Sequence, residues 1–153
     1  MENSFQRIGE KANADVGRKF ELCAQSYFAA QDVNLELNHK VRVGIEGGIK
    51  KFHAFDLGCN EKKILVECKS HRWTTGNNVP SAKLTVWNEA MYYFHLAPRN
   101  FRKIMFVLHH CNNQGKSLAS YYWDKYKHLV PNDVELWEYD EQKKIAIQIN
   151  PPH

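Results

Sequence analysis

Three residues near the middle of the chain have the types and spacing that phosphodiester hydrolysis requires. Asp56 follows an apolar run, and Glu67 and Lys69 come next, separated by Cys68. Mg²⁺ prefers carboxylate, carbonyl and water oxygens, so the two carboxylates and the Cys68 backbone carbonyl are candidate ligands, and Mn²⁺ would substitute. Lys69 would orient or deprotonate an attacking water and offset the charge that develops in the transition state.

The flanking residues predict how these side chains are brought together. Segments 52–57 and 64–69 are predicted strands joined by a turn, and a two-residue tip at Asn60-Glu61 would pair Asp56 with Leu65. Because side chains alternate along a strand, Asp56 would then share one face with Glu67, diagonally opposite it, and with Lys69. The other face would carry the apolar residues of both strands, Phe55, Leu57, Ile64 and Val66.

The acid-x-lysine triplet also has an ordinary structural interpretation. Alternating charges on a solvated strand keep a sheet soluble, so Glu67 and Lys69 could form only a surface ion pair in a structural protein. The catalytic interpretation is favoured because Asp56 and the predicted hairpin add a second carboxylate on the same face.

A helix from Asp15 to Ala30 is the next candidate element, with Asn13 or Asp15 as its N-cap. Apolar residues recur in it at helical spacing: Val16, Phe20, Cys23, Tyr27 and Phe28. Glu21 lies beside this stripe and could lean over the sheet toward a metal ion. The alternative is an ordinary flanking glutamate paired with Arg18 or Lys19.

Together, Gly17-Arg18-Lys19-Phe20-Glu21, Asp56 and Glu67-Cys68-Lys69 resemble the PD-(D/E)xK nuclease superfamily, over roughly residues 12–110. The resemblance implies the restriction-endonuclease-like fold, a single nuclease-like domain over residues 1–153. It also implies that Asp56 and Glu67 bind metal, that Lys69 assists hydrolysis and that Glu21 is a second-shell or second-metal ligand. Phe55 stands where the family name expects proline.

The remaining segments predict an α/β domain with a central mixed sheet, a meander plus a crossover-connected strand, flanked by helices. The predicted strands are 35–43, 102–109, 134–139 and 144–149, the helices 82–96 and 115–129, and the polar loop 70–79. The strand at 102–109 is apolar at its centre and reached through a helix, so it should run parallel to a neighbour.

The composition argues against a membrane-spanning, secreted or disulfide-rich protein. The chain of 153 residues is long enough for one core, its net charge is +4, and it has no bilayer-length apolar run or signal-peptide character. Its 4 cysteines are scattered without a CxxC pair, which argues against disulfides or a zinc cluster. We therefore expect a cytoplasmic protein without a membrane partner.

The loop after Lys69 and the helix that follows it carry the candidate DNA contacts. His71, Arg72 and Trp73 combine a proton carrier, a phosphate-binding fork and a stacking surface, and Lys83 and Asn88 are candidates for phosphate or water contacts. The alternative is a surface loop with Trp73 packed onto the domain.

Other histidines are better interpreted as ordinary hydrogen-bonded side chains. His109 and His110 should face opposite ways on a strand, so with Cys111 they would not form a metal cluster. His53 has the opposite parity to Asp56 and should project from the other face.

The sequence thus predicts a Mg²⁺-dependent DNA endonuclease, with a small type II restriction-type enzyme as the leading hypothesis. A Holliday-junction or other structure-specific nuclease fits as well. A protein with one such site would need to form a homodimer to cut both strands. The alternative from another class is a non-catalytic nucleic-acid-binding module on the same fold.

Overall fold

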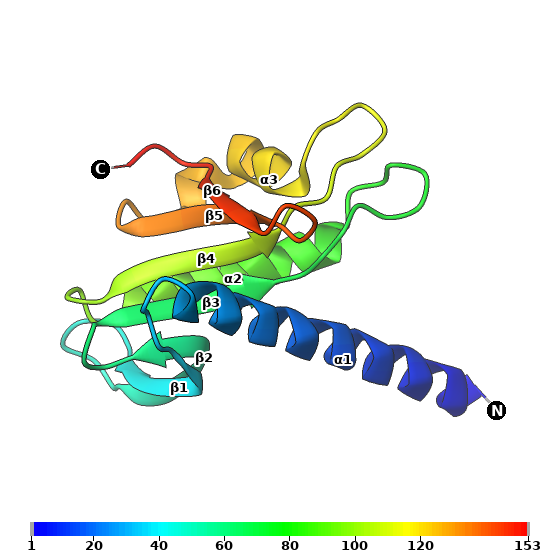
Figure 1. Cartoon of the computed structure of the whole chain (residues 1–153). Helices are drawn as coiled ribbons and strands as arrows, with labels where there is room; N and C mark the ends of the chain where they lie inside the picture. The colour runs from blue at the N-terminus through cyan, green and yellow to red at the C-terminus, as the bar shows by residue number, and fades with distance from the viewer. Residues whose placement is uncertain (1, 153) are drawn as a thin grey trace.

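The computed structural model describes the backbone of residues 2–152 and the side chains of residues 12–152. Within that range the strands form one six-stranded sheet, with helices on both faces (Figure 1). In chain order the elements are α1 (Glu2–Ala29), β1 (Glu36–Val43), β2 (Lys51–Cys59), β3 (Ile64–Lys69), α2 (Ser81–Leu96), β4 (Arg102–Leu108), α3 (Leu118–Tyr126), the 3₁₀ turn η1 (Lys127–Leu129), β5 (Val134–Asp140) and β6 (Ile145–Gln148).

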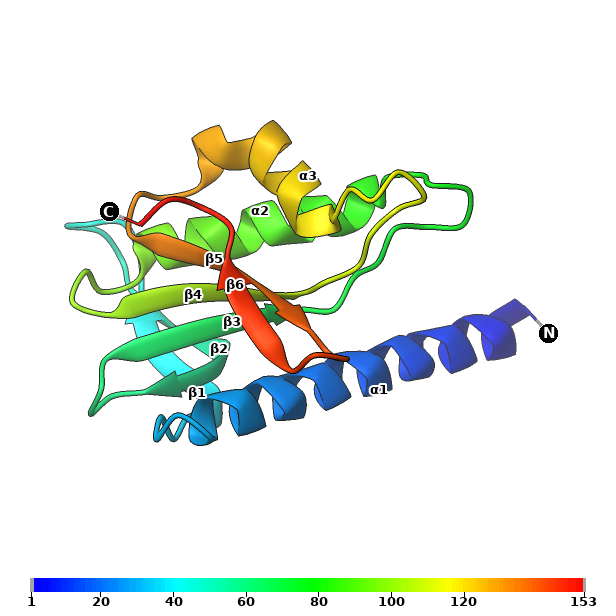
Figure 2. The ribbon, with the colours of Figure 1, turned by 45° about the horizontal axis from the view of Figure 1, so that its top comes forward.

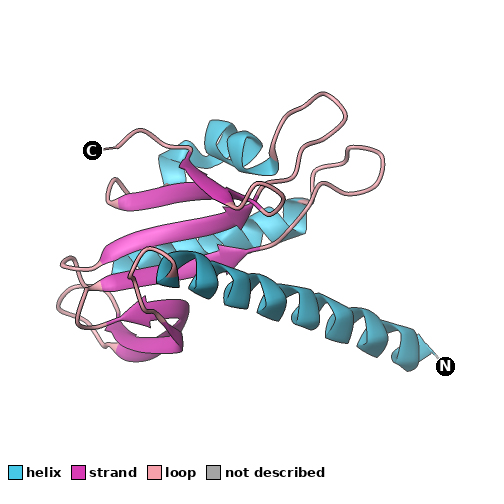
Figure 3. Ribbon diagram, in the orientation of Figure 1, coloured by secondary structure: helices cyan, strands magenta, loops and turns pink. Residues whose placement is uncertain are grey.

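The sheet is mixed and its strand order follows the chain, β1-β2-β3-β4-β5-β6. Antiparallel β1, β2 and β3 form the predicted meander, β4 and β5 run parallel to β3 after the α2 and α3 crossovers, and β6 returns antiparallel (Figure 3). The predicted α/β class, the mixed sheet and the parallel strand at 102–108 are confirmed. The helix predicted over 115–129 is shorter at both ends. Ser117 caps the start of α3 by accepting a hydrogen bond from the Ser120 amide, and residues 127–129 form the 3₁₀ turn η1.

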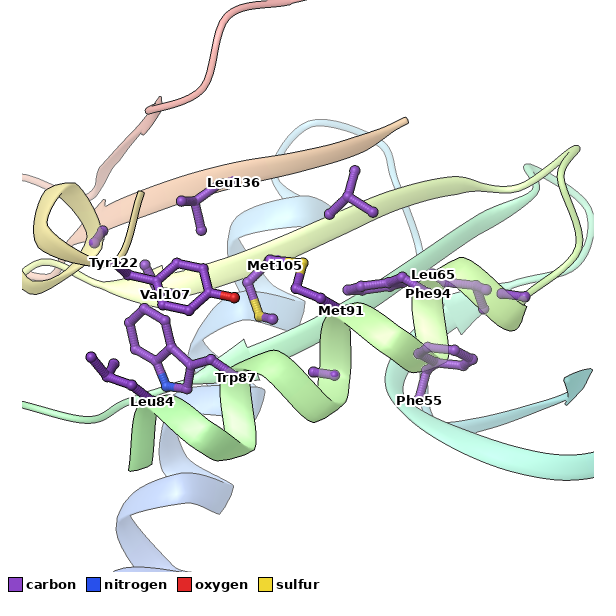
Figure 4. Close-up of a cluster of buried hydrophobic side chains, with 14 of the residues drawn as sticks. Phe55, Leu65, Leu84, Trp87, Met91, Phe94, Met105, Val107, Tyr122 and Leu136 are labelled. Atoms are coloured by element: carbon purple, nitrogen blue, oxygen red, sulfur yellow. The ribbon is translucent and has the colours of Figure 1, made fainter. Parts of the chain in front are cut away.

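Each face of the sheet has its own core. Figure 4 shows the core under α2 and α3, where Trp87, Phe94 and Tyr122 pack against Phe55, Leu65 and Met105. The other core lies under α1 and is built from residues that include Phe20, Ala24, Phe28, Leu57, Val66 and Phe106. The views in Figures 1 and 2 agree that α1 covers the face opposite α2.

Helix α1 begins much earlier than predicted. It starts at Glu2 rather than near Asp15, so Asn13 and Asp15 lie inside the helix and do not cap it. The segment before Asp15 contains no proline and several strong helix formers, which explains its continuation. The first part of α1 extends beyond the sheet (Figure 2), and Val16, predicted in the apolar stripe, is 50% exposed.

The β2–β3 hairpin has a different register from the predicted one. Leu57 pairs with Val66 and Gly58 with Leu65, so Asp56 and Glu67 are the next residues of the two strands beyond the last pair, and the Asp56 amide donates to Glu67 Oε1. Strand β2 continues to Cys59, past its predicted end at Leu57, while β3 begins at Ile64 as predicted. The turn between them has four residues and ends at Lys63, which takes a left-handed φ of 55°. A shift of two residues keeps the parity, so the carboxylates still converge.

Alternation along β1 and β2 reverses near Asp56. Leu57 packs in the α1 core as predicted, but Phe55 packs in the α2 core, so these two residues do not share a face. The paired β1 strand reverses at the same point: Asn38 takes a left-handed φ of 52°, and neither Asn38 nor Asp56 is paired, although the register is the same on both sides of them. Asp56 therefore lies where β2 rotates from one face of the sheet to the other.

None of the helices within residues 2–152 combines the length and apolar character needed to cross a bilayer.

Candidate active site

Asp56, Glu67 and Lys69 meet at the β2–β3 pair. The Asp56 amide donates to Glu67 Oε1 at 3.3 Å, and the Cys68 amide donates to Asp56 Oδ2 at 2.8 Å. Lys69 Nζ lies 3.7 Å from Glu67 Oε2, and both side chains are largely buried, with 13% and 10% exposed. The Glu67–Lys69 pair is therefore not the solvated surface ion pair of the ordinary interpretation.

These side chains line a small cavity of about 100 Å³ between the sheet and α2. Its walls come from β2, β3 and one flank of α2, and the lining residues are His53, Ala54, Asp56, Glu67, Lys69, Val86, Glu89, Ala90 and Tyr93. The reversal of β2 at Asp56 explains how a carboxylate near the α1 face also reaches this cavity.

Glu21 approaches Asp56 from the α1 side. Its side chain is 22% exposed and lies 3.6 Å from Arg18 Nη1, so the predicted pairing with Arg18 is present. Partial burial and the negative charge of Asp56 raise the pKa of Glu21, and Arg18 opposes that rise. Glu21 is thus both a partner of Arg18 and a neighbour of the carboxylate pair.

The pKa of Glu67 is raised by its surroundings. Burial, and then the negative charge of Asp56, raise the pKa of Glu67 to about 8, although Lys69 lowers it. The adjacent acids therefore repel each other when both are ionised. A divalent cation would relieve that repulsion, so the chemistry of this donor set fits a hard metal ion.

Part of a coordination shell would have to come from other oxygens. Among the residues that the structure describes, no group of three or more His, Cys, Asp or Glu side chains could hold a metal ion. The Cys68 carbonyl is a suitable addition: the Cys68 amide reaches Asp56, and the amide and carbonyl of one strand residue point to the same edge. Water and substrate phosphate usually complete a magnesium shell. The Cys68 thiol packs on the α1 side, and burial raises its pKa.

His53 lies in the site, which contradicts the prediction that it projects from the other face. Its ring stacks on Tyr93 with centroids 3.7 Å apart and planes 9° from parallel. Burial lowers the pKa of His53, against the opposing charges of Asp56 and Glu89. Strict alternation failed here because β2 rotates at Asp56. Glu89 and Tyr93 were also missed, and their helical spacing from Val86 was the available signal.

The loop after β3 is less exposed than predicted. Trp73 is 9% exposed, its indole N–H donates to the Lys116 carbonyl, and its ring packs against Tyr121, so it offers no free stacking surface. Arg72 is half exposed and pairs with Glu141 at 3.2 Å. His71 accepts a hydrogen bond from the Trp87 indole.

The two candidates on α2 have different surroundings. Asn88 accepts a hydrogen bond from the Tyr122 hydroxyl at 2.8 Å, so it joins α2 to α3 and does not line the cavity. Lys83 is exposed, and its charge acts on His71.

His109 and His110 make ordinary contacts. His109 Nδ1 lies 2.9 Å from Glu138 Oε1, and His110 Nδ1 accepts from the Trp73 amide at 3.0 Å. Cys111 Sγ contacts His109 at 3.6 Å.

No protein-family model matches the sequence, and no curated protein matches it. Among solved structures, the crystal structure of SSO0001 is similar, with 15% sequence identity and a TM-score of 0.36 over 99% of this chain. The chain spans 61% of the length of that protein. A TM-score this low does not establish a common fold.

Proposed function

We propose that this protein is a divalent-metal-dependent DNA endonuclease, of the small type II restriction type. The observation that carries the proposal is the cluster of Asp56, Glu67 and Lys69: two adjacent carboxylates, one of them largely buried, with a lysine 3.7 Å away in a cavity. Burying charged groups costs desolvation free energy, which a protein without a use for them would avoid. Acids with perturbed pKa values in a cavity are typical of functional sites.

In the proposed mechanism, Asp56, Glu67 and the Cys68 carbonyl would hold Mg²⁺ or Mn²⁺, and Glu21 would be an outer ligand. Bound there, the ion would polarise the scissile phosphate and lower the pKa of a water molecule. Lys69 Nζ would hold the attacking water by a hydrogen bond, and its positive charge would offset the charge gained by the phosphate oxygens. The enclosed position of Lys69 strengthens this interaction, because water screens it weakly.

We also propose that the fold is of the restriction-endonuclease-like kind. The order of elements supports this: a helix that carries Glu21, an antiparallel meander that carries Asp56 and Glu67, a crossover helix and a parallel strand. We further propose that the active species is a homodimer and that it acts in the cytoplasm.

The test is cleavage of plasmid and branched DNA in Mg²⁺, Mn²⁺ or EDTA. We expect metal-dependent cutting by the wild type, its loss in Asp56→Ala, and its retention in Glu61→Ala, which removes an exposed carboxylate from the turn of the same hairpin. Discrete linear plasmid products would support the restriction type, and symmetric nicks confined to branched DNA would replace it by a junction nuclease. DNA binding without cleavage in any metal would refute the enzyme and support a binding module.

A further inference from the structure

Trp87 fixes the tautomer of His71. Trp87 is completely buried, and its indole N–H donates to His71 Nδ1 at 2.7 Å. An indole nitrogen can only donate, so Nδ1 of the neutral imidazole carries no hydrogen. The proton of the neutral ring is therefore on Nε2, and a rigid core residue holds the ring in this orientation.

The ring is neutral at pH 7. Burial, and then the positive charges of Lys69 and Lys83, lower the pKa of His71 to about 4. Lys69 precedes His71 by two residues, the spacing at which side chains of an extended segment share a face. Lys83 lies one helical turn before Trp87, the residue whose indole holds the His71 ring. Beside the ammonium groups of Lys69 and Lys83, His71 thus contributes a neutral N–H donor and no positive charge of its own.

These three groups leave donors available. Lys83 is exposed and has no salt-bridge partner among the side chains of residues 12–152, and within the same range His71 Nε2 has no hydrogen-bond acceptor. Lys69 is shared, since its ammonium also lies 3.7 Å from Glu67. Hydrogen-bond donors are therefore present on Lys69 beside the carboxylate pair, on His71, and on Lys83 in the first turn of α2.

We propose that Lys69, His71 and Lys83 form a binding site for one backbone phosphate of the nucleic acid, adjacent to the phosphate that is cleaved. The inference rests on the proposed nuclease function and specifies which residues bind the DNA backbone next to the active site. Two ammonium groups and a neutral N–H suit the distributed charge of a phosphodiester, which accepts several hydrogen bonds. Contacts of this kind fix the register of the backbone and do not read bases.

The experiment separates phosphate binding from the structural role of His71 under Trp87. His71→Gln can keep both an acceptor for the indole and an outward donor, whereas His71→Glu keeps the acceptor but replaces the donor by a negative charge. His95→Glu, at an exposed position in the last turn of α2, is the charge-matched control. Binding of a labelled DNA duplex is measured in EDTA and cleavage in Mg²⁺, with single methylphosphonate linkages placed in turn around the cut.

We expect His71→Glu to weaken duplex binding about 10- to 100-fold, as for the loss of a hydrogen bond to a charged group, with His71→Gln near wild type and His95→Glu little changed. A neutral linkage at one position should weaken the wild type and cause no further loss in His71→Glu. The inference is overturned if His71→Glu binds like wild type, or if every neutral linkage weakens both proteins equally.

The two proposals fail separately. Cleavage by the wild type that is equally fast in His71→Glu would refute the phosphate site and leave the nuclease intact. The expected binding pattern without cleavage in Mg²⁺ or Mn²⁺ would refute the nuclease and support the phosphate site. Absence of DNA binding by the wild type would refute both.

Discussion

At the scale of single residues, the buried acid Glu67 links stability to function. Its pKa is about 8 in the folded chain, against an ordinary 4.5. Between these values the unfolded chain has released the proton while the folded chain retains it, so the folded state loses stability as pH rises from about 4.5 to about 8. A site arranged to bind a cation is therefore strained in its absence.

We predict that Glu67→Gln stabilises the metal-free protein at pH 8 and has little effect near pH 4.5, because glutamine does not ionise. Thermal melts across this pH range measure the effect, and Tm of the variant should be several degrees higher at the alkaline end. Mg²⁺ should raise Tm of the wild type at pH 8 but not that of Glu67→Gln, since the ligand is lost. Parallel pH dependence of the two melting curves would refute the role of Glu67.

Lys69 makes a different prediction, because its positive charge acts mainly in the transition state, while its share of substrate binding is one contact to the neighbouring phosphate. Lys69→Ala should abolish cleavage and leave affinity for DNA within about tenfold, the part expected from one phosphate contact. Single-turnover cleavage and equilibrium binding measured together test this. Lys40→Ala, an exposed lysine of β1, is the control and should cleave normally. Full cleavage by Lys69→Ala would exclude the role assigned to it.

At the scale of elements, the sequence predicted which strands meet but not how β2 rotates between them. Alternation of apolar residues assigned the order of elements and the convergence of Asp56 with Glu67. It misplaced Phe55 and His53, because a left-handed residue in the neighbouring strand, Asn38, cannot be recognised from periodicity. Contacts between distant segments, such as Trp73 with Lys116, also have no local signal.

Gly58 of β2 lies against the ring of His39 in the neighbouring strand β1. A Cβ at this position would lie 2.6 Å from Cδ2 of His39, whose ring is fixed by Asn60 Oδ1 at 2.9 Å. Gly58→Ala should therefore lower the free energy of unfolding by about 1–3 kcal/mol, as overpacking does. Chemical denaturation measures this loss.

Shortening the side chain of His39 should relieve the clash, which tests whether that side chain causes the loss of stability. Adding His39→Ala to Gly58→Ala should cost less than the sum of the single changes, because the smaller side chain makes room for the new methyl group. Strict additivity would show that Gly58 acts through its backbone freedom instead.

At the scale of the whole molecule, the proposed site raises a question of symmetry. Within residues 12–152 one carboxylate pair with a nearby lysine has been identified, while the strands of a DNA duplex are antiparallel. A pair of chains related by a twofold axis would present one site to each strand. The proposed function therefore predicts that breaking both strands requires two competent chains.

Subunit mixing tests this directly. Wild type mixed with an excess of Asp56→Ala, allowed to exchange, should convert supercoiled plasmid chiefly to nicked circles, since most wild-type chains then share a dimer with an inactive one. Linear product should fall faster than nicked product as the excess grows. The same excess of Glu61→Ala, which is expected to cleave, should not lower the linear product. If linear and nicked products fall together in the mixture, each chain cuts both strands independently, and the homodimer is not the active species.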